Sequence, residues 1–254
     1  MVEYFLGFVI ALAVGLTGFG GGVLAVPLLI AGLNVPVVEA VGTSLVFVTV
    51  IKLMAVNVYR RRGQVNWSVA ARLLLGGAPG VIGGSLLLWR MNTAALQPAV
   101  LAVVGATIAA MALLGLWKCW RNRTFAAAGA PREHLLPWLA FPIGVEVGFS
   151  SAGAGALGSL VLMECTTILP AHVIGTDLVF GVGLSALGGG LHLAAGEYNP
   201  ALLLRLCSGG LLGAWAGARL AGWLPPRPLR ACLCLALVGL GGHLGWRGLA
   251  LLAR

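Results

Sequence analysis

Apolar runs fill almost the whole of this chain, and they limit what it can fold into more than any other feature of the sequence. Only 9% of the residues are charged, whereas about 25% are charged in a typical soluble domain. Such a chain cannot cover a surface that faces water, and hydrocarbon is the solvent that suits it. We therefore expect an all-α polytopic membrane protein. The runs are 4–18, 20–33, 36–58, 67–89, 93–117, 135–149, 151–165, 168–193, 198–222 and 228–250.

The lengths of these runs alternate between long and short. A helix needs about 20 residues to cross a bilayer, and the third, fourth and fifth runs of each half reach that length. The first two runs of each half are only about 15 residues long and meet at a glycine cluster. We expect each short pair to form either a re-entrant hairpin or two short crossings, which gives roughly 8–10 transmembrane segments.

A shift of 133 residues aligns the chain with itself without a gap. Residues 42–47 (Gly-Thr-Ser-Leu-Val-Phe) lie over residues 175–180 (Gly-Thr-Asp-Leu-Val-Phe), and five of these six positions match. A repeat of this kind sets the architecture. It predicts a first transmembrane repeat at 1–117, a basic linker at 118–134 and a second repeat at 135–254. Further matching pairs are Gly15 and Gly148, Gly20 and Gly153, Gly22 and Gly155, Gly63 and Gly196, Asn66 and Asn199, Arg72 and Arg205, and Gly76 and Gly209.

Positive charge distinguishes the loops of the two repeats. The loop at Arg60–Arg62 is strongly basic, whereas its equivalent around Glu197 has no Lys or Arg. Basic loops stay in the cytoplasm, so equivalent loops are expected on opposite faces of the membrane. The repeats should therefore be inverted, with a cytoplasmic linker and both termini in the periplasm.

Two glycine-rich segments, 15–22 and 148–155, interrupt the apolar runs at equivalent positions. Backbone broken at membrane depth must be buried in protein or line a watery cavity, and inverted-repeat transporters place such breaks at the substrate site. A helix that begins near Gly21 would aim free N–H groups at this site, which suits an anion. Alternatively, the glycines only allow close helix packing. The candidate binding residues here are Gly20, Gly21, Gly22, Gly153 and Gly155.

The matching Gly-Thr-x motifs supply the next candidates, Thr43, Ser44, Thr176 and Asp177. Small hydroxyls can donate to an oxyanion, although they can equally form hydrogen bonds between helices. A carboxyl in an apolar run is costly, and it is a functional candidate by default. Beside an anion, Asp177 would have to be protonated, which suggests proton-linked transport. Otherwise Asp177 caps a helix.

Three cations lie within or near the apolar runs. Arg72 and Arg205 occupy equivalent positions about one turn inside the fourth run of each half, where each could either bind an oxyanion through two hydrogen bonds or snorkel to the membrane surface. We include both as candidate substrate ligands. Lys52 is expected to snorkel toward the end of its run at Arg60.

The remaining composition excludes several classes of function. The net charge of +9 comes from short clusters between apolar runs, as in cytoplasmic loops, so we do not expect nucleic acid as a partner. The four histidines are dispersed and form no metal-ligand spacing or catalytic pair. We expect no enzyme activity, no metal and no cofactor.

Three features together resemble the TauE/SafE family of membrane permeases. They are the run Gly18-Phe19-Gly20-Gly21-Gly22 followed by Pro27, the Gly42-Thr43-Ser44 motif, and the segments 63–67 and 196–200, each followed by a helix with Gly-x₃-Gly spacing. The resemblance covers essentially the whole chain. It implies transport of sulfur oxyanions or organosulfonates across the bacterial cytoplasmic membrane, including sulfite export.

Together these features favour a secondary transporter for a small sulfur-containing anion, with sulfite export as the leading substrate and direction. The alternative is a passive anion channel, or a permease for a sulfonate or thiosulfate. The expected partners are this anion and the lipid bilayer, and assembly into a homo-oligomer stays open. The expected location is the bacterial inner membrane.

Overall fold

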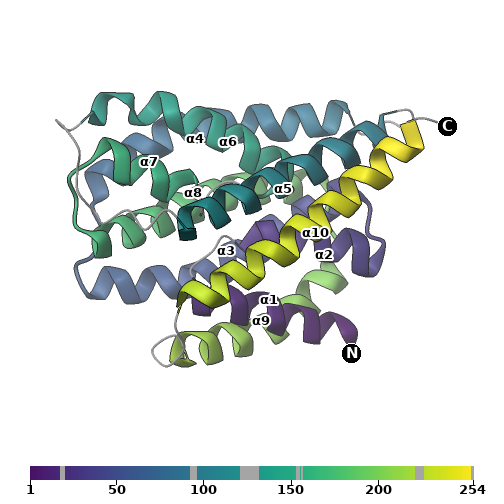
Figure 1. Ribbon diagram of the computed structural model, residues 1–254, viewed down its shortest axis with the longest axis horizontal. Coiled ribbons are helices and arrows are strands. Elements are labelled where there is room, and N and C mark those ends of the chain that lie inside the picture. Colours follow the sequence, from purple (N-terminus) through teal and green to yellow (C-terminus); the bar gives the residue numbers. More distant parts are fainter. Residues whose placement is uncertain are drawn as a thin grey trace.

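The computed structural model is a bundle of helices (Figure 1), and it describes residues 1–17, 21–91, 96–120, 132–152, 155, 157–220 and 226–252. These residues contain no β-strand, which confirms the predicted all-α class. A single 3₁₀ turn, Glu133–Leu135, precedes α6. The α-helices are α1 Val2–Thr17, α2 Gly21–Leu33, α3 Val37–Arg61, α4 Trp67–Arg90, α5 Gln97–Trp120, α6 Leu136–Ser150, α7 Leu157–Cys165, α8 Pro170–Ala195, α9 Pro200–Leu220 and α10 Pro226–Leu252.

Within these described residues, five helices are long and apolar enough to cross a membrane: α3, α4, α5, α8 and α10. α9 has 21 residues, which is a spanning length, and its predicted crossing stays a prediction. α2 has 13 residues and α7 has 9. At 1.5 Å per residue they are about 20 Å and 14 Å long, which is less than the ~30 Å of a hydrocarbon core. α2 and α7 are therefore too short to cross the hydrocarbon core alone.

The two repeats are interleaved rather than placed side by side. α1 of the first repeat packs along α9 of the second, and α6 of the second packs along α4 of the first. The glycines of the repeated Gly-x₃-Gly motifs allow these contacts. A Cβ at Gly76 would collide with the backbone of Pro137, and a Cβ at the equivalent Gly209 would collide with the backbone of Tyr4. Residues 133 positions apart thus make matching contacts with the opposite repeat.

Equivalent helices run antiparallel where they meet. α3 packs on α8, with Gly42 against His192 near one end and Thr49 bonded to Ser185 near the middle. α5 packs in the same way on α10, and this pair lies obliquely across the bundle in Figure 1. Opposite directions of equivalent helices are what inverted repeats require. The orientation of each repeat in the membrane stays a prediction.

The α3–α8 pair is held at both ends by a matching pair of hydrogen bonds. The backbone N–H of Asn66, which caps α4, donates to the Thr176 hydroxyl at 3.0 Å. The backbone N–H of Asn199, just before α9, donates to the Thr43 hydroxyl at 3.1 Å. Each threonine therefore fixes the start of a helix in the other repeat.

Candidate functional site

The breaks predicted at the two glycine-rich segments are present, and they bring the two repeats into contact. α2 begins at Gly21, and α6 ends at Ser150, followed by the cap residue Ser151, a non-glycine residue in the left-handed conformation (φ 62°). Left-handed backbone is uncommon outside glycine and marks a position that its surroundings hold in place. Gly22 packs directly against the backbone of Ser151, because a Cβ on Gly22 would lie 2.6 Å from the carbonyl carbon of Ser151.

Hydroxyl groups converge on the same junction. The hydroxyls of Ser44 on α3 and Ser151 share a hydrogen bond of 3.2 Å. The Ser150 hydroxyl donates to the Glu146 carboxylate at 2.6 Å, and the backbone N–H of Ala152 donates to the Ser150 oxygen. Both serines are buried. The junction is thus a cluster of buried polar groups. It lies next to the first backbone N–H groups of α2, which have no partners within their own helix.

Asp177 borders the other side of the α6–α7 break. This residue of α8 is only 8% exposed, and its Oδ1 atom lies against Gly158 in the first turn of α7. Its equivalent in the first repeat is Ser44, which contacts Ser151 before the break. The third residues of the two Gly-Thr-x motifs therefore contact opposite sides of the α6–α7 break. Ser44 places a hydroxyl at the end of α6, and Asp177 places a carboxyl at the start of α7.

The structure divides the predicted ligands into three groups. Gly21, Gly22 and Ser44 lie around the junction, Gly155 lies in the turn between α6 and α7, and Asp177 lies against the start of α7. Thr43 and Thr176 are buried, but they accept the hydrogen bonds that fix α9 and α4. Gly20 and Gly153 lie outside the residues that the structure describes.

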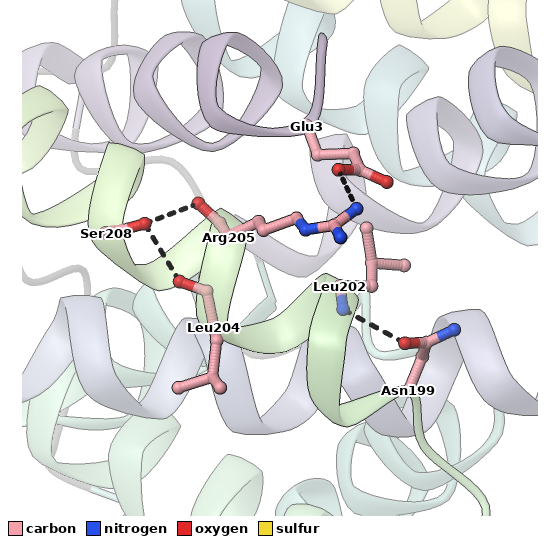
Figure 2. A network of polar contacts seen from close by, with 6 residues as sticks. All are labelled: Glu3, Asn199, Leu202, Leu204, Arg205 and Ser208. Carbon is pink, nitrogen blue, oxygen red and sulfur yellow. Dashed lines mark hydrogen bonds and ion pairs between the residues drawn. The ribbon is translucent and has the colours of Figure 1, made fainter. Parts of the chain in front are cut away.

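The two arginines form the third group, and each is paired with an acid. Arg205 donates to Glu3 at 2.7 Å (Figure 2), and Arg72 donates to Glu133, although the two acids are not at equivalent positions of the repeats. Both arginine side chains are almost half exposed, at 47% and 46%. Figure 2 also places Arg205 just beyond the first turn of α9, where its guanidinium points to Glu3 of α1.

The sequence analysis missed two features of the junction. We expected Lys52 to snorkel, and this was wrong: the α3 residue is buried inside the bundle, with 4% of its surface exposed. The pair Ser150-Ser151 lies inside the glycine-rich segment 148–155, and its two adjacent hydroxyls at the predicted break were the available signal. No local pattern distinguishes the buried Lys52 from a snorkelling lysine, because its burial depends on helices from the other repeat.

Comparisons with known proteins were made over the whole chain. The family model for Sulfite exporter TauE/SafE matches residues 4–244. The chain is 27% identical over 237 residues to the probable membrane transporter protein YjnA of Bacillus subtilis (strain 168), which covers 89% of this chain and 91% of that protein.

Two further similarities point to the same class of protein. A probable membrane transporter protein of Xylella fastidiosa (strain Temecula1) is 35% identical over 110 residues, which is 43% of this chain and 41% of that protein. The probable membrane transporter protein YdhB of Bacillus subtilis (strain 168) is 24% identical over 240 residues, covering 92% and 96%. No solved structure matches the chain.

Proposed function

Because this chain belongs to the TauE/SafE sulfite exporter family of membrane transporters, we propose that it moves a small sulfur-containing anion across the bacterial cytoplasmic membrane. Sulfite is the proposed substrate, and export is the proposed direction. The choice of sulfite rests on the family description, since the relatives above are named only as probable membrane transporters.

The meeting of the two repeats at one broken helix is the observation that carries the proposed site. The α2 N-terminus, the Ser44 hydroxyl and the Ser151 hydroxyl lie together there. Free N–H groups at a helix start and nearby hydroxyls are donors that suit an oxyanion. Movement of one repeat against the other would then open this site to each side in turn.

Asp177 makes proton linkage part of the proposal. A carboxylate beside the anion would repel it, so Asp177 takes up a proton as the anion binds. Each anion would then be accompanied by a proton, and a pH gradient could drive its accumulation. The cost of a buried acid in a transmembrane helix is consistent with such a role.

The proposed orientation follows from the basic loops. Arg60 and Arg61 end α3, whereas the equivalent end of α8 leads to Glu197 without a Lys or Arg. We propose that Arg60–Arg62 and the 118–134 linker face the cytoplasm, and that both termini face the periplasm.

Flux into proteoliposomes of purified protein tests the function. Sulfite, thiosulfate, sulfate, a sulfonate and a carboxylate would each be offered with and without a pH gradient. We expect sulfite to be moved fastest and to be concentrated when the gradient is present. Flux that never concentrates the anion would indicate a passive channel, and movement of the carboxylate alone would refute the proposed substrate.

A further inference from the structure

The imidazole of His192 is buried with one of its nitrogens unpaired among the described residues. His192 lies in the last turn of α8 and is fully buried. Its Nδ1 atom accepts a long hydrogen bond of 3.4 Å from the indole N–H of Trp89 on α4. Its Nε2 atom has no hydrogen-bond partner in the part of the chain that the structure describes. Almost all buried polar groups in proteins are paired, so this exception requires an explanation.

The bond from Trp89 fixes which nitrogen of this ring carries the proton. An indole N–H can only donate, so Nδ1 of His192 must be the unprotonated nitrogen that accepts. A neutral imidazole with an unprotonated Nδ1 carries its proton on Nε2. The unpaired atom is therefore a hydrogen-bond donor. Trp89 also holds the ring in place, because the two rings pack edge-on with 5.3 Å between their centroids.

Contacts along α3 place this donor within one helical turn of the junction. A Cβ at Gly42 would lie 3.1 Å from the Cγ atom of the His192 ring. Ser44, whose hydroxyl bonds that of Ser151, is two residues farther along α3, which is an advance of about 3 Å. The ring and the junction therefore lie beside the same turn of α3.

Contacts along α4 give the same position independently. Trp89 follows Ser85 by four residues, or about one turn, and the Ser85 hydroxyl donates to the Gly148 carbonyl in the last turn of α6 at 3.4 Å. The ring of His192 is thus about one turn of α4 from the α6 end of the junction. Beyond it, the backbone N–H of Glu197 donates to the His192 carbonyl at 2.9 Å. His192 therefore lies between the junction and the loop at Glu197.

The inverted repeat places a second polar ring toward the opposite end of the α3–α8 pair. The position equivalent to His192 in the first repeat is Tyr59. A Cβ at Gly175 would lie 3.4 Å from the Cβ atom of Tyr59, as a Cβ at Gly42 would lie against His192. Each Gly-Thr motif thus packs against a ring of the opposite repeat that carries a hydrogen-bond donor. Such donors are placed at the two ends through which a substrate would reach the junction.

Packing alone explains the arrangement at His192 poorly. A buried donor without a partner lowers stability, and an apolar ring of similar shape would avoid that cost. An anion, in contrast, accepts several hydrogen bonds and forms stronger ones than a neutral acceptor does. Polar side chains inside membrane proteins commonly mark the paths of substrates. The unpaired N–H next to the junction therefore suits an anion that is present only during transport.

We infer that His192 binds the transported anion and donates its Nε2–H to it, at the end of the junction nearest Glu197. The donors of Ser44 and of the α2 N-terminus lie next along the path. The ring is buried in this structure, and it meets the anion when movement of the repeats opens this side. This inference rests on the proposed anion transport, and it adds a neutral donor from the second repeat to the proposed site.

Two amide substitutions that each preserve one nitrogen position of the ring provide the test. His192→Gln keeps an N–H donor near the place of Nε2, whereas His192→Asn keeps an acceptor for Trp89 but removes that donor. Sulfite binding and the concentration dependence of sulfite flux would be measured with the purified full-length chain. We expect the half-saturating concentration to rise about tenfold to a hundredfold in His192→Asn, the value of a hydrogen bond to a charged group. It should stay within about threefold of the wild type in His192→Gln.

His243 supplies the matched control, because it is exposed on α10. The same two substitutions at His243 should leave sulfite binding unchanged. If His192 served only the packing of α8, its variants would yield less folded protein. The folded fraction would then bind sulfite with the half-saturating concentration of the wild type.

A measurement on the unsubstituted chain covers the case in which a variant does not fold. The four histidines would be labelled with nitrogen-15, and the signal of His192 would be assigned by replacing the other three in turn. We expect a neutral ring protonated on Nε2, whose N–H proton signal moves downfield when sulfite saturates the protein. A His192 signal that sulfite at saturation does not move would overturn the inference, as would wild-type binding by folded His192→Asn.

Failure of this inference is distinct from failure of the proposed function. If the wild type moves sulfite and His192→Asn does so with the same half-saturating concentration, only the role of His192 is lost. If the wild type moves a carboxylate instead, the proposed substrate is lost, and the same comparison is made with that carboxylate. If it moves no anion, both fail.

Discussion

A methyl group added at Gly22 should separate the two broken segments, and this change tests the junction most directly. The new Cβ would lie 2.6 Å from the Ser151 carbonyl carbon and 2.5 Å from its Oγ atom. Ordinary contact begins at 3.4 Å, and the carbonyl oxygen of Ser151 lies closer still, so Gly22→Ala requires a shift of at least about 1 Å. A hydroxyl could rotate away, but the peptide group of Ser151 cannot, because it is fixed in the left-handed conformation at the end of α6.

The expected cost follows from this geometry. Overpacking of a well-packed interior costs about 1–3 kcal/mol, and displacement of a binding group by about 1 Å can reduce activity about a hundredfold. We expect sulfite flux in proteoliposomes to fall at least about tenfold, and the free energy of unfolding to fall by about 1–3 kcal/mol. The Ser44–Ser151 hydrogen bond, at 3.2 Å, should be lost.

Two glycines of the same helix provide graded controls. A Cβ at Gly21 would meet methyl groups of Val48 and Val14 at 3.0 and 3.2 Å, and side chains can yield more easily than backbone. A Cβ at Gly32 would meet nothing within 4 Å. Flux should therefore decrease in the order Gly32→Ala, Gly21→Ala, Gly22→Ala, with Gly32→Ala equal to the wild type. Wild-type flux and stability in Gly22→Ala would refute the close contact of the two breaks.

Three further predictions concern orientation and charge. A cysteine placed at 197 should be labelled by an impermeant reagent from outside, and one at 61 should not; equal labelling of both would exclude inverted repeats. Asp177→Asn should keep sulfite binding but lose its pH dependence: the wild type should bind more tightly as the pH falls, because protonation removes the repelling charge, and the variant should not. Identical pH profiles, measured side by side because sulfite itself titrates near neutral pH, would remove Asp177 from the mechanism. Arg72→Ala should leave flux within about twofold and cost at most about 1 kcal/mol, as expected for an exposed ion pair, and a tenfold loss of flux would return Arg72 to the binding site.

Local patterns in the sequence determined the class of the protein and the position of its breaks. Scarce charge and long apolar runs require helices in a membrane, and α2 begins at Gly21 as expected from the first glycine cluster. The match of residues 42–47 with 175–180 identified the repeat. The family followed from short motifs in a fixed order, and the family model over residues 4–244 confirmed it.

The tertiary structure alone decided how these parts combine. α1 of the first repeat packs on α9 of the second, and α6 of the second packs on α4 of the first. No periodicity within a segment encodes that exchange. The roles of the cations depend on it as well: Arg72 and Arg205 resemble substrate ligands in sequence, but Glu133 from the linker and Glu3 from the first repeat pair with them near the starts of α4 and α9. Lys52 resembles a snorkelling lysine in sequence, but the packed bundle buries it to 4% exposure. Composition is a local property and determines whether a helix lies in lipid or in water. The partner of a charge comes instead from a distant segment of the chain, 61 residues away for Arg72 and 202 residues away for Arg205.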